Sequence, residues 1–215
     1  MMLTAAQIAA FLPAALLLSL APGPDNLTVL SLGLARGRSA SFGFAMGCAA
    51  GCLNHTLLAA LGVSAMIAAS PLAFRLLQYA GAAYLLWLGW QALGSRGASL
   101  AANRDDAAGG GFGLYFRRGL IANAINPKVA LFFLALLPQF VVAGGARPGL
   151  QTAALGLLFT LAAALVFGAI ALGAGRIGDW LRRRPAATRW LDRAAGLVFI
   201  GLGLRLALAE APAPR

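Results

Sequence analysis

The sequence predicts an all-α integral membrane protein of six transmembrane helices, arranged as two inverted three-helix repeats. Its 215 residues are 60% hydrophobic and only 11% charged, whereas soluble domains are roughly 45–50% apolar. Apolar stretches of about the 20 residues needed to cross a bilayer recur six times. They lie near residues 7–34, 42–69, 72–93, 119–143, 149–172 and 189–209.

These stretches use almost the whole chain, so we expect a single transmembrane domain, 1–215, without a soluble domain. The first half is 1–93 and the second is 119–215, joined by a cytoplasmic linker, 94–118, whose glycines predict flexibility. No basic residue precedes the first apolar run, which is too long for a signal-peptide core. The first helix should therefore remain in the mature protein.

The first and fourth predicted helices are each interrupted by proline and polar residues. Proline removes a backbone donor and frees carbonyls, and inside a membrane such a break persists only where it lines a cavity. Pro24 and Pro127 are 103 positions apart, close to half the chain, and three helices per half would insert the second half upside down. The helix-break residues are Pro22, Gly23 and Pro24 in the first half and Pro127 in the second.

One break carries a carboxylate, Asp25, and the other an ammonium, Lys128. Asp25 is eleven residues before Arg36 and Lys128 ten after Arg118, so at about 1.5 Å per residue both lie about 15 Å deep. That depth is near the middle of the bilayer, where charged groups are costly and usually functional. An amino acid could bind both, with its carboxylate at Lys128 and its ammonium at Asp25, and protonation of Asp25 could couple export to the proton gradient. The alternative is a static salt bridge that braces two broken helices.

Three asparagines flank the breaks: Asn26, Asn123 and Asn126. Their side chains could satisfy backbone groups freed by the prolines or contact the substrate. Asn123 precedes Asn126 by three residues and would share its helix face, so both could face one cavity.

The second predicted helix carries small residues at Gly43, Gly47 and Gly51, a spacing that allows another helix to approach closely. That helix could belong to the same chain or to a second copy, so a homo-oligomer is possible. One face of the same helix carries three possible metal ligands, Cys48, Cys52 and His55, which could hold a soft metal ion. The alternative function is therefore a soft-metal cation exporter or a thiol-handling membrane protein. Small cysteines and a hydrogen-bonded histidine are also ordinary packing residues.

Basic residues predict the orientation. The loops after the first, third and fifth helices hold twelve of the seventeen Lys and Arg residues, so we expect these loops in the cytoplasm and both termini outside. The net charge of +11 is explained by topology and anionic lipid, and no nucleic-acid partner is expected. The phosphate-binding pattern Gly-Lys-Ser/Thr after a strand is absent, and we expect no cofactor and no enzymatic activity.

With these motifs in view, the chain resembles the LysE/RhtB family of bacterial amino-acid exporters over nearly its whole length. The resemblance rests on Pro22-Gly23-Pro24-Asp25, Gly37-Arg38, Gly81-Ala82-Ala83-Tyr84-Leu85 with Gly89, and Asn126-Pro127-Lys128 followed by Phe132-Phe133 and Pro138-Gln139-Phe140. It implies a six-helix protein of the bacterial inner membrane that exports amino acids or close derivatives in exchange for protons. The small number of charges near the midplane favours a small, neutral substrate.

Overall fold

The computed structural model describes residues 3–63, 70–95, 110–142 and 147–209, and within these ranges the chain forms helices and no strands. In chain order the helices are α1 (Ala5–Leu20), α2 (Pro24–Ala35), α3 (Arg38–Leu58), the π-helix η1 (Ala59–Val63), α5 (Pro71–Gly94), α6 (Phe112–Ala124), α7 (Pro127–Leu131), the π-helix η2 (Phe132–Leu136), the 3-10 helix η3 (Leu137–Phe140), α8 (Pro148–Arg183) and α9 (Pro185–Leu208).

Proline begins five of these helices, α2, α5, α7, α8 and α9. The first helical position needs no intrahelical N–H bond and suits the fixed φ of proline, so each proline here starts a helix without costing a hydrogen bond. At two places the start follows directly on the end of another helix. The axes of α1 and α2 differ by 52°, and those of α6 and the segment Pro127–Phe140 differ by 51°.

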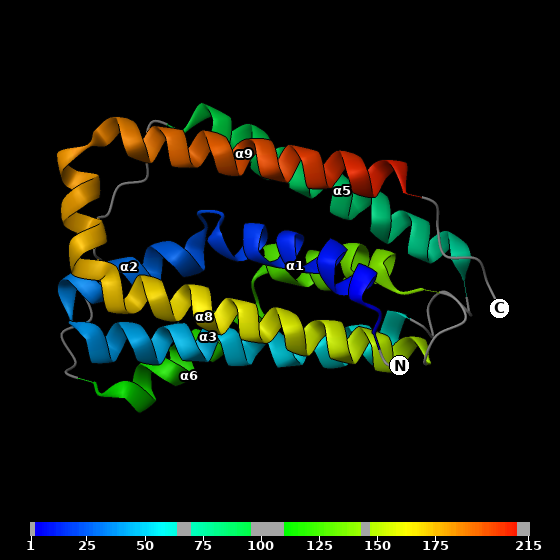
Figure 1. Ribbon diagram of the computed structural model, residues 1–215, viewed down its shortest axis with the longest axis horizontal. Coiled ribbons are helices and arrows are strands. Elements are labelled where there is room, and N and C mark those ends of the chain that lie inside the picture. The colour runs from blue at the N-terminus through cyan, green and yellow to red at the C-terminus, as the bar shows by residue number, and fades with distance from the viewer. Residues whose placement is uncertain (1–2, 64–69, 96–109, 143–146, 210–215) are drawn as a thin grey trace.

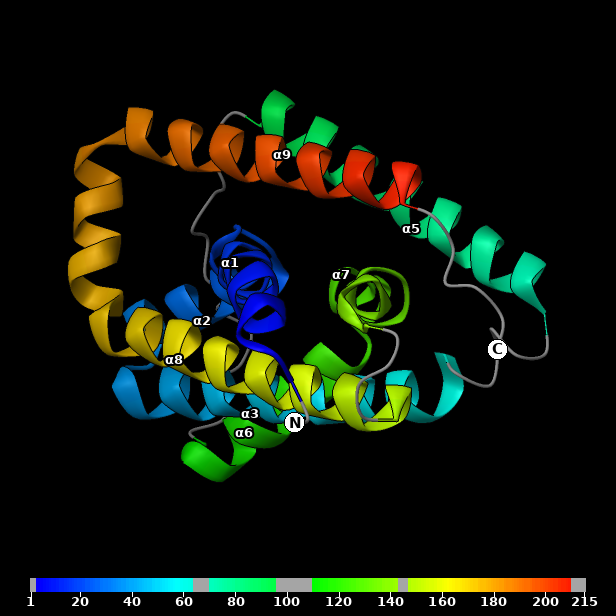
Figure 2. The ribbon, with the colours of Figure 1, turned by 45° about the vertical axis from the view of Figure 1, so that its right-hand side comes forward.

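The helices form two sides with a pair of segments between them. α5 and α9 lie against each other on one side, α3, α6 and α8 lie on the other, and α1 and α7 run between (Figures 1 and 2). α8 bends near its C-terminal end to reach α9 (Figure 1). The two broken segments are therefore enclosed by longer helices, which is the position expected of a site.

Glycines set the closest helix contacts. A Cβ on Gly47 would collide with the carbonyl oxygen of Phe116 in α6, and one on Gly119 would collide with that of Phe44 in α3. A Cβ on Gly43 would likewise collide with the backbone of α6, and one on Gly51 would collide with the side chain of Asn123. The small-residue stripe of α3 thus packs within this chain.

The same close packing joins α5 to α9. A Cβ on Gly89 would lie 2.8 Å from the carbonyl oxygen of Gly196, and one on Gly196 would lie 2.8 Å from that of Gly89. Gln78 of α5 donates hydrogen bonds to the carbonyl oxygens of Leu206 and Ala209, both 2.7 Å. The two helices form a tightly closed pair.

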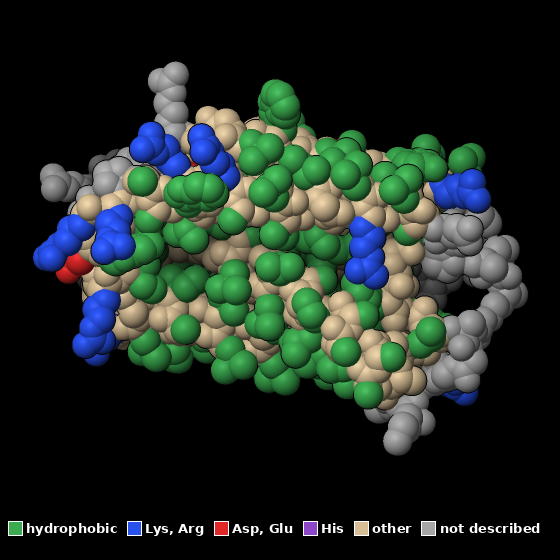
Figure 3. Space-filling view, turned by 45° about the horizontal axis from the view of Figure 1, so that its top comes forward, with side chains coloured by type: hydrophobic (Ala, Val, Ile, Leu, Met, Phe, Trp, Pro, Cys, Tyr) green, Lys and Arg blue, Asp and Glu red, His purple; other side chains and the backbone are tan. Residues whose placement is uncertain are grey.

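The surface is that of a membrane protein. Figure 3 shows hydrophobic side chains over the length of one face and Lys and Arg side chains gathered mainly toward the ends. Within the described ranges, two continuous helices are long and apolar enough to cross a bilayer, Arg38–Gly62 and Pro148–Leu181, and up to four spans result if each bent pair counts as one. α5 and α9 do not meet that test. The chain is a multi-pass membrane protein.

Two expected boundaries are corrected. α6 begins at Phe112, earlier than the expected 119, and α8 continues to Arg183, beyond the expected 172. Both extensions contain arginines, which were assigned to loops because of their charge. Side chains at the polar end of a membrane helix can reach water, so charge there does not end the helix. Most of the expected linker, residues 96–109, lies outside the described ranges.

Candidate functional site

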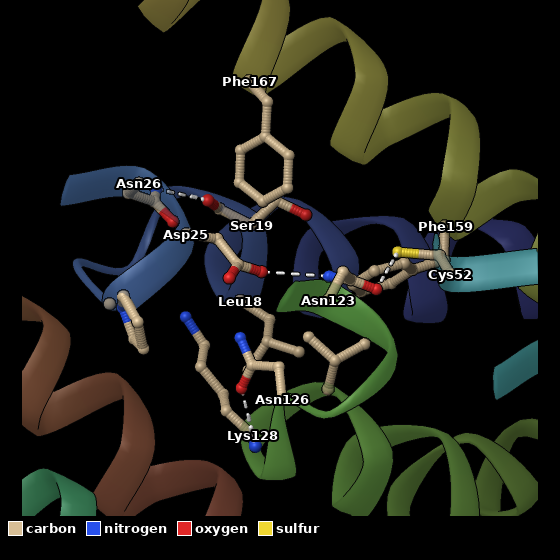
Figure 4. Close-up of a pocket in the computed structure, with 13 residues that line it drawn as sticks. Leu18, Ser19, Asp25, Asn26, Cys52, Asn123, Asn126, Lys128, Phe159 and Phe167 are labelled. Carbon is tan, nitrogen blue, oxygen red and sulfur yellow. Dashed lines mark hydrogen bonds between the residues drawn. The ribbon is translucent and has the colours of Figure 1, made fainter. Parts of the chain in front are cut away.

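The two helix breaks meet at one pocket, although they are about a hundred residues apart in sequence. Figure 4 shows Asp25 and Asn26 entering it from α2, and Asn123, Asn126 and Lys128 from the α6–α7 break. Its lining consists of Leu18, Ser19, Gly23, Pro24, Asp25, Asn26, Cys52, Asn123, Asn126, Lys128, Val129, Phe159 and Phe167.

Asp25 lies in the first turn of α2 and is 5% exposed. The side-chain amide of Asn123 donates a hydrogen bond of 2.9 Å to its Oδ2 atom. The positive end of the α2 dipole also favours a carboxylate at this position. One half of the chain thus supplies the charge, and the other half supplies its hydrogen-bond donor.

Lys128 is 7% exposed, and its Nζ atom donates a hydrogen bond of 3.0 Å to the carbonyl oxygen of Ala21. Ala21 follows the last turn of α1, so the ammonium lies at the negative end of that helix dipole. The ammonium also lies 5.0 Å from the ring centre of Phe199 in α9, an aromatic contact that favours a cation. A Cβ on Gly23 would approach Nζ to 3.3 Å, so the glycine leaves room for this side chain.

Asp25 and Lys128 line the same pocket but do not pair with each other. Among the described side chains, no nitrogen–oxygen distance of 4.0 Å or less joins them, and each is held by a partner from the opposite half. A static salt bridge between two broken helices is therefore not what this conformation contains.

Asn26 and Asn126 cap the broken ends. The Asn26 amide donates to the carbonyl oxygen of Ser19 at 2.8 Å, which satisfies a group at the end of α1. The Oδ1 atom of Asn126 accepts from the backbone N–H of Lys128 at 3.0 Å, as an N-cap residue does. Both residues also line the pocket, so capping and lining the pocket are combined.

Asn123 is fully buried and joins the site to α3. In addition to its bond to Asp25, its Oδ1 atom lies 3.6 Å from the thiol of Cys52, and its backbone oxygen lies 2.9 Å from Nε2 of His55. The i, i+3 spacing of Cys52 and His55 places them on one helix face, but only the fold shows that this face meets Asn123. Sequence reasoning had no signal for that partner.

These contacts bear on the alternative of a metal site. Cys48 and Cys52 are buried free thiols. In the part of the chain that the structure describes, no three His, Cys, Asp or Glu side chains lie together in an arrangement that could hold a metal ion. Cys52 and His55 instead meet Asn123, so the geometry gives the metal alternative no support.

The pocket is small. It leaves about 10 Å³ for the centre of a water-sized molecule, which is room for about one water. Phe159 separates it from a cluster of buried rings, Phe11, Phe132, Phe133 and Phe140, with centroid distances between neighbours of 4.9 to 6.1 Å. This space is smaller than an amino acid, so residues that line the pocket would have to move to admit one.

Beyond these rings, two buried glutamines tie three segments together. The amide of Gln7 in α1 donates to Oε1 of Gln151 in α8 at 2.7 Å and to the carbonyl oxygen of Phe140 at 3.0 Å. Gln151 also exchanges hydrogen bonds of 3.1 and 3.0 Å with the backbone of Val142. This network lies at the end of the molecule where α1 and α8 begin. Because it is uncharged, it can open without leaving a buried charge.

Comparison with known proteins agrees with this architecture. The model of the LysE type translocator family matches residues 16–210. An uncharacterised membrane protein of Pseudomonas aeruginosa is 35% identical over 88% of this chain and 89% of its own length. The homoserine/homoserine lactone efflux protein of Salmonella typhimurium is 32% identical over 94% of this chain and 96% of its own length. The leucine efflux protein of Klebsiella pneumoniae is 29% identical over 93% of this chain and 94% of its own length. No solved structure matches the chain.

Proposed function

Because the chain belongs to the LysE type translocator family, we propose that it exports small neutral amino acids or close derivatives across the bacterial inner membrane in exchange for protons. Two relatives carry names that refer to efflux of homoserine or leucine, both neutral amino acids. The observation that carries the proposal is that two opposite charges line one pocket without an ion pair between them, each held by a neutral partner. A zwitterion between Asp25 and Lys128 would satisfy both.

The substrate carboxylate takes the ammonium of Lys128 in place of the Ala21 carbonyl oxygen, and the substrate ammonium takes Asp25. Each exchange replaces one charge-assisted contact by another, so the cost of burying the charges is shared with the substrate. Protonation of Asp25 removes the carboxylate that holds the ammonium. Proton entry from outside therefore favours release, which couples export to the proton gradient.

The proposed architecture comprises six spans in two inverted repeats with the pocket at the bilayer midplane. The two bends of 52° and 51° support the repeat, as do the matched contacts of the two halves. α3 packs on the second broken pair, mainly on α6, and α8 packs on the first broken pair, on both α1 and α2. In this arrangement the corresponding helices α5 and α9 face each other, and so do α3 and α8.

The small volume of the pocket supports the assignment of this conformation to a state of the transport cycle without bound substrate. The ring cluster and the Gln7–Gln151 network close the path toward the ends of α1 and α8, which the positive-inside rule places outside. Export requires these contacts to separate, and the irregular helices η2 and η3 next to them provide a segment without regular α-helical bonds to break.

The test is transport by the purified protein in proteoliposomes loaded with radiolabelled amino acids under an imposed proton gradient. We expect gradient-stimulated efflux of a neutral amino acid, loss of that efflux in Asp25→Asn, and retention in Asp179→Asn, whose carboxylate is exposed on α8. Unchanged gradient stimulation in Asp25→Asn would exclude the coupling role of Asp25. Absence of efflux for every amino acid would exclude amino-acid export, and zinc and cadmium would then be tested in the same vesicles.

A further inference from the structure

The pocket has two chemically different sides. Asp25, Lys128 and the asparagines make one side polar, whereas the other side is formed by Leu18, Val129, Phe159 and Phe167, each at most 5% exposed. Figure 4 shows Phe167 pointing into the pocket from α8 above Asp25, while Phe159 enters from the same helix near Cys52. The ammonium and carboxylate of an amino-acid substrate would bind the polar side, so the side chain of the substrate would contact the apolar side.

Phe159 is held in place by a packed aromatic cluster. The ring of Phe159 lies 4.9 Å from that of Phe132 and 5.0 Å from that of Phe133, and both of these rings are fully buried. Phe159 cannot turn aside without disturbing the core, because rings in such clusters are closely packed on several sides. Eight residues along α8, about 12 Å, separate it from Phe167. The two rings therefore bound a space of limited length.

We propose, on the basis of the function proposed above, that Phe159 and Phe167 are specificity-determining residues that select an uncharged aliphatic side chain. A charged side chain is rejected because the two charged groups of the pocket, Asp25 and Lys128, are already used by the zwitterion. An aromatic side chain is rejected because the fixed ring of Phe159 occupies the space it needs. Once the lining has moved to admit a substrate, an aliphatic side chain packs against both rings and leaves no polar group unpaired.

The experiment measures competition among alanine, leucine, phenylalanine and lysine for exchange in proteoliposomes. In the wild-type protein leucine should compete best and lysine least. Phe159→Ala should raise competition by phenylalanine relative to leucine by about tenfold or more, the scale on which apolar pockets distinguish side chains. Phe159→Trp should have the opposite effect, because the larger ring leaves less space: competition by leucine should fall relative to competition by alanine. Leu161→Ala, on the same helix but 63% exposed, is the matched control and should leave the order unchanged.

The outcomes separate this inference from the function on which it rests. If the wild-type protein exchanges no amino acid, the proposed function fails and this inference fails with it. If amino acids are exchanged but the ratios stay at wild-type values in active Phe159→Ala and Phe159→Trp, only the specificity assignment is overturned. A preference for lysine would overturn the specificity assignment and the neutral substrate class proposed above, while amino-acid export itself would stand. Phe167→Leu, which removes no ring from the packed cluster, gives the same test if the Phe159 variants do not fold.

Discussion

At the scale of single residues, Asn123 has the most demanding position in the molecule. Its amide donates to Asp25, its Oδ1 atom faces the thiol of Cys52, and its backbone oxygen meets His55. All four groups are buried, so none can turn to water if a partner is lost. Leaving a buried polar group unsatisfied costs about 1–3 kcal/mol, more when the group is charged.

Asn123→Ala should therefore lower both stability and transport. We expect the free energy of unfolding in mixed micelles to fall by about 1–3 kcal/mol, because the buried carboxylate of Asp25 loses its hydrogen-bond donor. Gradient-driven efflux should fall at least about tenfold, since Asp25 is no longer held in place. Asn54→Ala, on the exposed face of α3, is the control and should change neither quantity. Wild-type efflux from a folded Asn123→Ala protein would show that the hydrogen bond to Asp25 is dispensable.

Gly23 is a second residue whose role depends on one contact. A methyl group there would approach the ammonium of Lys128 to 3.3 Å, so Gly23→Ala should displace the ammonium from the Ala21 carbonyl oxygen. We expect transport to fall about tenfold, equivalent to about 1.4 kcal/mol. The control is Gly113→Ala in α6, where a Cβ meets nothing within 4 Å. Equal efflux from the two variants would mean that the position of Lys128 does not matter.

At the scale of helices, the sequence predicts what is encoded locally. The breaks at residues 21–23 and 125–126 lie directly before Pro24 and Pro127, which begin the next helices, and the glycine stripe of α3 predicts a close helix contact. The start of α6 and the end of α8 were misplaced because arginines in helical ends resemble loop residues. The partnership of His55 with Asn123 could not be predicted, because it joins residues 68 positions apart on different helices.

The glycine contact between α3 and α6 leads to a prediction about stability. Gly47→Ala places a methyl group against the backbone of Phe116 and 2.9 Å from the backbone nitrogen of Leu120, and backbone atoms cannot rotate away. The helices must separate, so we expect a loss of about 1–3 kcal/mol in the free energy of unfolding, as for overpacked cores. Gly201→Ala in α9 meets nothing within 4 Å and should be neutral or stabilising. A thermal melt of Gly47→Ala that matches the wild type would contradict the close packing.

At the scale of the whole molecule, the roles of α5 and α9 decide the topology. They pack on each other through Gly89 and Gly196, and α9 reaches the site through the contact of Phe199 with Lys128. Among the described helices, α5 and α9 are not counted as membrane spans by length and apolar composition, whereas the other helices supply up to four spans. Six spans place an odd number, three, between the segment 96–109 and the C-terminal end of the chain. Four spans place two between them.

Reporter fusions distinguish these topologies. A phosphatase that is active only outside the cytoplasm should be active when fused after Arg215 and inactive when inserted within residues 96–109, because three spans carry the chain from one side to the other. A fluorescent protein that matures only in the cytoplasm should give the reverse pattern at both sites. The same side for both sites would show that an even number of spans joins them, which removes the inverted repeat. Opposite sides with the C-terminal end in the cytoplasm would keep the repeat but reverse the orientation, so that the Gln7–Gln151 network would close the inner path and not the outer one.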